Sequence, residues 1–237
     1  MTNTAVILCG GKGERLKPYS ISFPKSLMPV GEYCVLEIII MQLAKNGFKN
    51  IILAVSHQAG IIKAFFGCGK KHGVKITYVL EKVPLGTIGP LKNIKSLPKY
   101  FLVMNGDVLT DLDFSDFFKG HVLSNSLMTV STIKKSYQID YGVIHSSSEI
   151  IKMFTEKPKI THDVSMGIYA MQKDSLKYIP KNKSFGFDSM INTLLKQNIK
   201  IYSKNHNGFW LDIGKPDDYL FISNQFHKYA SKILKNE

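Results

Sequence analysis

The sequence AVILCGGKGERL, residues 5–16, passes from an apolar run into a glycine-rich loop that ends in arginine and leucine. Residues 5–8 have the length and apolar character of a buried strand. Glycines after a strand let backbone N–H groups approach a phosphate chain, and Arg15 offers a rigid fork of donors. The glycine spacing fits neither a dinucleotide fingerprint nor a Walker loop. A phosphate-binding loop is therefore one interpretation, and a tight turn without a ligand is the other.

Apolar runs of strand length alternate with segments of helical period around this loop. We expect strands at residues 5–8, 51–55, 74–79 and 100–104, and helices at 35–46 and 88–97. This alternation predicts an α/β fold with a Rossmann-like, mixed but mainly parallel sheet that is flanked by helices. After Asp113 we expect strands at 126–133, 141–145, 150–154 and 164–172, and helices at 187–197 and 219–234. No linker interrupts the chain, so residues 1–237 are expected to form a single domain.

The composition limits the classes of partner. The 237 residues carry a formal net charge of +13, but the lysines are scattered and are not interleaved with aromatic residues. A solvated lysine-rich surface explains this better than a nucleic-acid site, although nucleic acid stays a rival on charge alone. No apolar run reaches the roughly 20 residues of a membrane span, and the N-terminus does not have the pattern of a signal peptide. With three unpatterned cysteines, we expect a cytoplasmic protein without membrane or nucleic-acid partners.

A second motif makes the resemblance specific. PKSLMPV at residues 24–30 follows GGKGERL, and Lys25 lies ten residues after Arg15. The two motifs resemble the N-terminal signature of the sugar-1-phosphate nucleotidyltransferase family, whose fold is of the nucleotide-diphospho-sugar transferase type. Members join a nucleoside triphosphate to a sugar-1-phosphate and release pyrophosphate. The resemblance implies that Arg15 binds the triphosphate and that Lys25 lies near the reacting phosphates. It also implies a nucleotide-binding half at about 1–113 and a sugar-phosphate-binding half at about 114–237.

The segment EKVPLGT, residues 81–87, resembles the part of the family that packs against the base. An ionised Glu81 only accepts hydrogen bonds, so it suits the N1–H and N2–H₂ donors of guanine. This favours GTP, although Glu81 pointing to solvent is the alternative, with UTP, CTP or dTTP as the nucleotide. The nucleotide-binding residues that the resemblance implies are Leu8, Gly10, Gly11, Gly13, Arg15, Glu81, Pro84, Gly86 and Thr87.

Two further motifs supply carboxylates that lie far apart in the sequence. NGDVLTD at 105–111 places Asp107 just beyond an expected strand, where open α/β sheets bind ligands. GFWLDIG at 208–214 contains Asp212 and resembles the closing motif of the family. The resemblance implies that Asp107 and Asp212 coordinate one Mg²⁺ ion, and that Arg15, Lys25 and Asp107 are the catalytic residues. NGDVLTD is similar to mannose-1-phosphate guanylyltransferase-like members in particular, and the chain as a whole resembles the compact members, which include heptose-1-phosphate guanylyltransferases and muramate-type uridylyltransferases.

The sugar site is expected in the second half of the chain. The resemblance implies that Gly142 and Glu156 contact sugar hydroxyls, that Lys157 binds the sugar phosphate, and that Ser165 lies in the same site. Ser165 and Met166 depart from the Asn-Ala-Gly or Asn-Gly-Gly of many members, and Glu14 replaces a small residue beside the triphosphate. We expect a manno-configured heptose or hexose; an inactive nucleotide-sugar-binding relative is the alternative. The closing helix is a candidate homodimer contact.

Overall fold

The computed structural model describes residues 3–11, 13–17, 19–21, 23–56, 58–81 and 83–234. A seven-stranded sheet with the order β12-β8-β11-β6-β1-β4-β5 forms its centre. The strands are β1 (Asn3–Cys9), β4 (Phe48–Val55), β5 (Lys75–Leu80), β6 (Tyr100–Asn105), β8 (Met128–Gln138), β11 (Lys159–Gln172) and β12 (Tyr202–His206). All neighbours run parallel except β11, which is antiparallel to both β6 and β8. The prediction of a mixed, mainly parallel sheet is confirmed.

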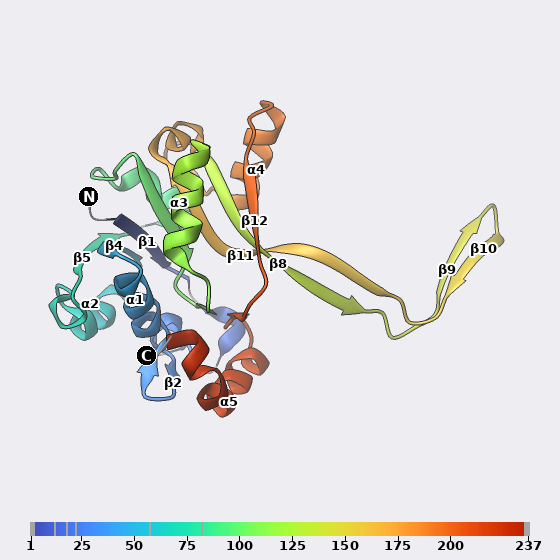
Figure 1. Ribbon diagram of the computed structural model, residues 1–237, viewed down its shortest axis with the longest axis horizontal. Coiled ribbons are helices and arrows are strands. Elements are labelled where there is room, and N and C mark those ends of the chain that lie inside the picture. The colour runs from blue at the N-terminus through green and yellow to red at the C-terminus, as the bar shows by residue number, and fades with distance from the viewer. Residues whose placement is uncertain are drawn as a thin grey trace.

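Helices cover both faces of the sheet (Figure 1). They are α1 (Val35–Lys45), α2 (Ala59–Phe66), α3 (Phe114–Ser124), α4 (Phe187–Lys196) and α5 (Pro216–Leu234), with short 3-10 helices η1 (Glu14–Leu16), η2 (Lys25–Leu27), η3 (Lys70–His72), η4 (Gly89–Asn93) and η5 (Lys173–Tyr178). Side chains alternate across the sheet, so Ile7 of β1 joins a core with α1, α3 and α5, whereas Val6 joins a second core with η4 and α4.

Helix α5 closes the first core from outside. Its buried residues Ile222, Phe226 and Ile233 pack into the core that contains α1. Gln42 of α1 donates hydrogen bonds from Nε2 to the carbonyl oxygens of Thr110 and Ile233, at 2.6 and 2.5 Å. The amide therefore ties α5 to the strand that follows Asp107. Because its apolar face is used within the chain, α5 keeps mainly its outer face for the predicted homodimer contact, which stays a prediction.

A long arm leaves the body between β8 and β11 (Figure 1). We define it as residues 133–164, the outer part of the β8–β11 ladder together with a hairpin of β9 (Val143–Ser147) and β10 (Ile150–Thr155). The inner residues of both long strands are buried, and the outer ones are exposed. The arm thus carries residues 142–157 away from the sheet.

The sequence-based prediction was wrong at one helix and incomplete at others. Instead of a helix at residues 88–97, the chain forms only the short η4, and Ile94 already has an extended backbone (φ −87°, ψ 105°). Gly89 and Pro90 disfavour an α-helix, and Leu97 precedes a proline, which biases it away from helical geometry. Helices α2 and α3 and strand β12 were not predicted. Among the described residues, none of the helices combines the length and apolar character that crossing a bilayer requires.

Candidate active site

A cavity of about 1110 Å³ opens at the carboxyl ends of β1, β4 and β6. This is the position at which open α/β sheets bind ligands, because loops diverge there and backbone N–H groups are free. The cavity is lined by Leu8, Cys9, Gly10, Gly11, Gly13, Glu14, Arg15, Lys25, Ser26, Ala54, Ser56, Glu81, Pro84, Gly86, Thr87, Pro90, Asn105, Gly106, Asp107, Asp212 and Gly214. Every residue predicted for the nucleotide, the metal and catalysis is among them.

The glycine-rich loop shapes one side of the cavity. Gly13 has a left-handed backbone (φ 64°), and its carbonyl oxygen accepts a hydrogen bond from Ser20 Oγ at 2.6 Å. The turn then enters η1, where the buried Leu16 anchors the loop and leaves Arg15 exposed. Glu14 pairs with Lys17 at 2.5 Å between Oε2 and Nζ. The carboxylate that departs from the family pattern is thus partnered by a cation beside it.

A two-stranded ladder brings the distant carboxylates together. β7 (Val108–Thr110) pairs antiparallel with β13 (Trp210–Asp212), and Asp212 lies opposite Val108. The N–H of Ile213 donates to the carbonyl oxygen of Asp107 at 2.9 Å, which extends the ladder by one step. Asp111 steadies the returning loop, since its Oδ1 accepts hydrogen bonds from His206 Nε2 and the Phe209 N–H. The register therefore sets Asp107 beside Asp212.

Lys25 lies between these carboxylates. Its Nζ forms an ion pair with Asp107 Oδ2 and lies 3.8 Å from Asp212 Oδ1. Burial raises the pKa of Asp212, the negative charge of Asp107 raises it further, and Lys25 and Arg15 act in the opposite direction. The site consequently holds two close carboxylates that one lysine compensates incompletely.

The carboxylate pair fits a divalent cation. Asp107 Oδ1 and Asp212 Oδ1 are buried and have no hydrogen-bond partner among the residues that the structure describes. Hard oxygen donors of this kind suit Mg²⁺, which usually takes one or two carboxylates and completes its shell with water and substrate phosphates. Within the described part of the chain, no cluster of three or more His, Cys, Asp or Glu residues could hold a metal without such help.

Glu81 and Gly86 form a further part of the cavity lining. Glu81 Oε1 accepts a hydrogen bond from the Leu85 N–H at 2.6 Å, and Oε2 lies against Gly10, where a Cβ atom would be only 2.6 Å away. Gly86 has a φ of +76°, and a Cβ there would lie 2.7 Å from the Phe185 carbonyl oxygen. The first carboxylate oxygen fixes the loop, which leaves the second as the acceptor on the cavity side.

The residues predicted for the sugar lie apart from the cavity. Gly142 and Glu156 are neighbours on the arm, because a Cβ on Gly142 would lie 3.1 Å from Glu156 Oε2. Lys157 follows at the root of the hairpin with a positive φ of 44°. Ser165 lies at the base of the arm, where its Oγ donates to Tyr169 Oη at 3.1 Å. None of these four residues lines the cavity, so their roles stay predictions.

Met166 and Trp210 contact each other in the packing between β11 and β13. The Met166 side chain is fully buried, and its sulfur accepts a hydrogen bond from Ser131 Oγ at 2.9 Å. Trp210 Nε1 donates to the Met166 carbonyl oxygen at 2.9 Å. This hydrogen bond links β13 to β11, and neither Met166 nor Trp210 lines the cavity.

Several lining residues were not predicted. Ser56 follows β4 and donates from Oγ to the Gly10 carbonyl oxygen at 3.0 Å, while Asn105 and Gly214 flank the two aspartates within motifs already recognised. The signal that could have found them is position: Ser56 follows β4, Asn105 ends β6, and Gly214 lies two residues after Asp212. Burial raises the pKa of Cys9 to about 12, so this lining thiol stays protonated and is not a nucleophile.

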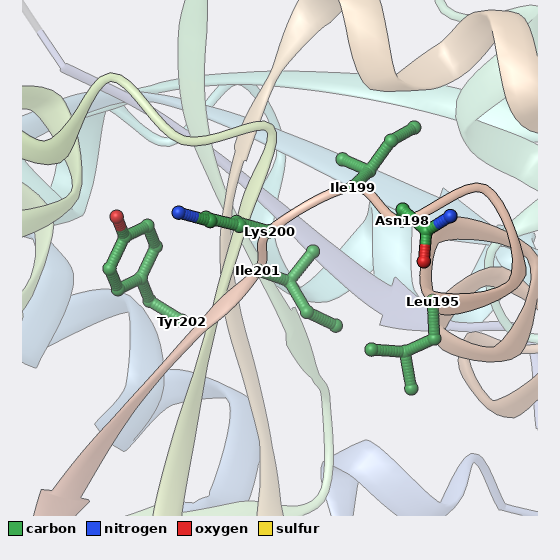
Figure 2. A pocket seen from close by; sticks show the side chains of 6 residues that line it. All are labelled: Leu195, Asn198, Ile199, Lys200, Ile201 and Tyr202. Atoms are coloured by element: carbon green, nitrogen blue, oxygen red, sulfur yellow. The ribbon is translucent and has the colours of Figure 1, made fainter.

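A second hollow has no such chemistry. It measures about 370 Å³ and lies between the end of α4 and the start of β12 (Figure 2). Its lining is Leu195, Asn198, Ile199, Lys200, Ile201 and Tyr202. The hollow contains no carboxylate, so the cavity at Asp107 and Asp212 is the candidate active site.

The sequence of this chain is similar to those of a known protein family. The profile of the family described as Nucleotidyl transferase matches residues 4–229. Mannose-1-phosphate guanylyltransferase catalytic subunit beta of Danio rerio is 32% identical over 91% of this chain and 62% of its own length. UTP--glucose-1-phosphate uridylyltransferase of Synechocystis is 30% identical over 91% of this chain and 61% of its own length. The chain thus spans about three fifths of the length of these relatives.

The fold of this chain is also similar to solved structures. HddC from Yersinia pseudotuberculosis is 27% identical with a TM-score of 0.74, and the match covers 95% of this chain and 100% of that chain. A further structure shows HddC in complex with GMP-PN. Since the family profile covers nearly the whole sequence and its motif residues converge on one cavity, the chain belongs to the nucleotidyl transferase family.

Proposed function

We propose that this protein transfers a nucleoside monophosphate from a nucleoside triphosphate to a sugar-1-phosphate and releases pyrophosphate. The observation that carries the proposal is the convergence of Arg15, Lys25, Asp107 and Asp212 on one cavity beside a glycine-rich loop. Nucleotidyl transfer asks a protein for positioning and charge neutralisation and needs no protein nucleophile. A cavity with cations, paired carboxylates and backbone donors meets that requirement.

Each part of the site has its own role in the proposed reaction. The loop from Gly10 to Gly13 receives the triphosphate, and Arg15 neutralises the pyrophosphate as it leaves. Asp107 and Asp212 would hold Mg²⁺, which would supply charge neutralisation and a template for the phosphates. Lys25, which lies beside both aspartates, would offset the negative charge that develops at the α-phosphate as the sugar-phosphate oxygen attacks.

GTP is the nucleotide that the site supports best. Glu81 keeps one carboxylate oxygen on the cavity side, and guanine offers two adjacent N–H donors to such an acceptor. Guanylyltransferases among the relatives, and HddC with GMP-PN, support the same choice. A uridylyltransferase is also among the relatives, so UTP is the second candidate.

The relatives and the free cysteines support proposals for the sugar and for the location of the protein. Relatives that act on mannose-1-phosphate support a manno-configured hexose or heptose. We assign Gly142, Glu156, Lys157 and Ser165 to the sugar-phosphate, and the halves 1–113 and 114–237 to nucleotide and sugar within one domain. The three free cysteines suit a cytoplasmic location, where nucleoside triphosphates are made.

A substrate matrix tests this proposal. Four nucleoside triphosphates are combined with the 1-phosphates of mannose, glucose and D-glycero-D-manno-heptose, and pyrophosphate release is measured with Mg²⁺. We expect release to require both substrates and to be fastest with GTP and a manno-configured sugar. Preference for another base would overturn the GTP assignment, and no release from any pair would overturn the activity. The Asp107→Asn variant controls for contaminating enzymes.

A further inference from the structure

The arm, residues 133–164, extends away from the body and exposes apolar side chains that nothing in the same copy covers within the described part of the chain. Its stem is a continuous ladder from Ser165 opposite Thr132 to Lys159 opposite Gln138. The Ile139 N–H then donates to the Pro158 carbonyl oxygen at 3.0 Å, so pairing continues to the root of the hairpin. Figure 1 shows this ladder pointing away from the body. The arm is therefore held outward by its own hydrogen bonds.

Large apolar side chains cover the arm and are exposed. They are Tyr137, Tyr141, Ile144, Ile150, Ile151, Met153, Phe154 and Ile160, with exposed fractions of 41–79%. At about 200 Å² for a whole side chain of this size, they expose on the order of 900 Å². That is close to the roughly 800 Å² that each partner contributes to a standard interface. An isolated hairpin is marginally stable, and apolar patches of this size mark interaction sites.

The apolar residues occupy both faces of the hairpin. Phe154 lies opposite Ile144 on one face, whereas Met153 lies opposite His145 on the other. Ile150, opposite Ser147, shares the second face. If the hairpin folded back onto its own body, it would cover only one of its two faces. Two arms that cross can cover both faces, each with one face on the partner's body and the other on the partner's arm.

The described lining of the cavity carries more acidic than basic side chains. Its described lining contains four carboxylates, from Glu14, Glu81, Asp107 and Asp212, but only two cationic side chains, from Arg15 and Lys25. Lys25 is engaged by the aspartates, while two phosphorylated substrates add further negative charge. Lys157 and Lys159 lie on the arm near its hairpin. The hairpin also carries Asp140, Glu149 and Glu156, so the charge that would complement the cavity is that of the Lys157 side chain and not of the arm as a whole.

We propose that two copies of this chain form a two-fold symmetric dimer in which the arm of each copy closes the active-site cavity of the other. Gly142, Glu156 and Lys157 then meet the sugar-phosphate in the partner's cavity. This inference rests on the proposed function for the role of the cavity. The stem beyond the sheet and the hairpin each span five or six residues, so the arm reaches roughly 35 Å, enough to cross to a neighbouring copy.

The first test measures mass in solution. We expect light scattering to give twice the 26.7 kDa chain mass for the wild type. The double variant Ile151→Asp/Phe154→Asp is expected to be monomeric, and its kcat/KM for the sugar-phosphate is expected to fall at least tenfold. Leu123→Asp adds the same charge at an exposed apolar side chain on α3 and should stay dimeric. A monomeric wild type, or an arm variant that stays dimeric, overturns the proposal.

The second test asks whether the arm acts in trans. An Asp107→Asn chain and a Lys157→Ala chain are co-expressed with different tags, and the heterodimer is purified. In a trans arrangement one of its two sites combines an intact cavity with an intact arm, so activity is expected at about half the wild-type value. A heterodimer no more active than the average of the two parent homodimers overturns the proposal, as does a Lys157→Ala homodimer with wild-type turnover. If the wild type itself shows no transfer, the proposed function fails, whereas the mass measurement still decides the arm exchange.

Discussion

Lys25 and Asp107 form an ion pair although 82 residues separate them in the sequence. The 3-10 helix η2 supplies the lysine, and the end of β6 supplies the aspartate. Asp212 joins them through the β7–β13 ladder. In this arrangement Lys25 takes a place between the carboxylates that a divalent cation would otherwise share, so the lysine and the metal compete for the same oxygen atoms.

Replacing Lys25 with methionine is expected to separate catalysis from metal binding. Turnover should fall about 10²–10³-fold, because a transition-state cation is lost. At the same time Mg²⁺ should bind more tightly, since no lysine competes for Asp107 and Asp212. Both effects can be measured on Lys25→Met by steady-state kinetics and by the rise of Tm with Mg²⁺, using exposed Lys228→Met as the control. Weaker Mg²⁺ binding in Lys25→Met would contradict the competition.

Removing one carboxylate is expected to abolish the response to metal. Millimolar Mg²⁺ should raise the Tm of the wild type, because it relieves repulsion between Asp107 and Asp212, whereas NaCl of equal ionic strength should not. Asp212→Asn should show no such difference. Calorimetry in Mg²⁺ and in EDTA provides the measurement. An Asp212→Asn protein with a wild-type response would place the metal elsewhere.

Glu81 is expected to set the choice of base. Glutamine keeps the acceptor for the Leu85 N–H but presents an N–H₂ group in place of the second oxygen. Hydrogen bonds to a charged group contribute about 1.5–3 kcal/mol, so the kcat/KM ratio of GTP to UTP should fall about 10–100-fold in Glu81→Gln. Glu32→Gln, at an exposed turn, is the matched control. An unchanged ratio would mean that Glu81 does not read the base.

His121 is expected to make stability depend on pH. It is 1% exposed, its Nε2 has no hydrogen-bond partner within the described part of the chain, and burial lowers its pKa to about 4. The unfolded chain, with an ordinary pKa near 6.5, binds more protons between these values. Stability should thus be full above pH 6.5 and fall by up to about 3 kcal/mol as the pH drops towards 4.

The slope of the free energy of unfolding against pH separates the titration of His121 from the loss of its packing contacts. His121→Asn loses contacts at every pH, but its free energy of unfolding should fall less steeply between pH 6.5 and 4 than that of the wild type. Urea unfolding at several pH values gives the slopes. His145→Asn, at an exposed site on the hairpin, should keep the wild-type slope. Equal slopes in His121→Asn and the wild type would exclude His121 as the origin.

The lining of the large cavity could be predicted because its motifs are local in the sequence. A glycine-rich loop with an arginine directly follows the first strand, and all nine residues that the resemblance implies for the nucleotide line one cavity. Helix α3 was missed although Asp113 accepts a hydrogen bond from the Asp116 N–H at its start and Phe114, Phe117 and Phe118 share one buried face. Those signals were present in the sequence and could have been used.

The arm could not be predicted from local patterns. Strands at 141–145 and 150–154 were expected, and they exist, but β8 and β11 run longer than their apolar cores. How far a ladder continues depends on hydrogen bonds between segments that are distant in sequence. Similarly, the pairing of Asp212 with Asp107 follows from the β7–β13 register, which no spacing along the chain reveals.

The fate of the α-phosphate tests the central claim most directly. The protein is incubated with Mg²⁺, GTP labelled at the α-phosphate and mannose-1-phosphate or the heptose-1-phosphate, and the products are separated. The account predicts that the label enters a GDP-sugar, that one pyrophosphate forms for each GDP-sugar, and that Asp107→Asn makes neither. Label recovered as free GMP or GDP without dependence on the sugar-phosphate, or product formation that survives in Asp107→Asn, would contradict it.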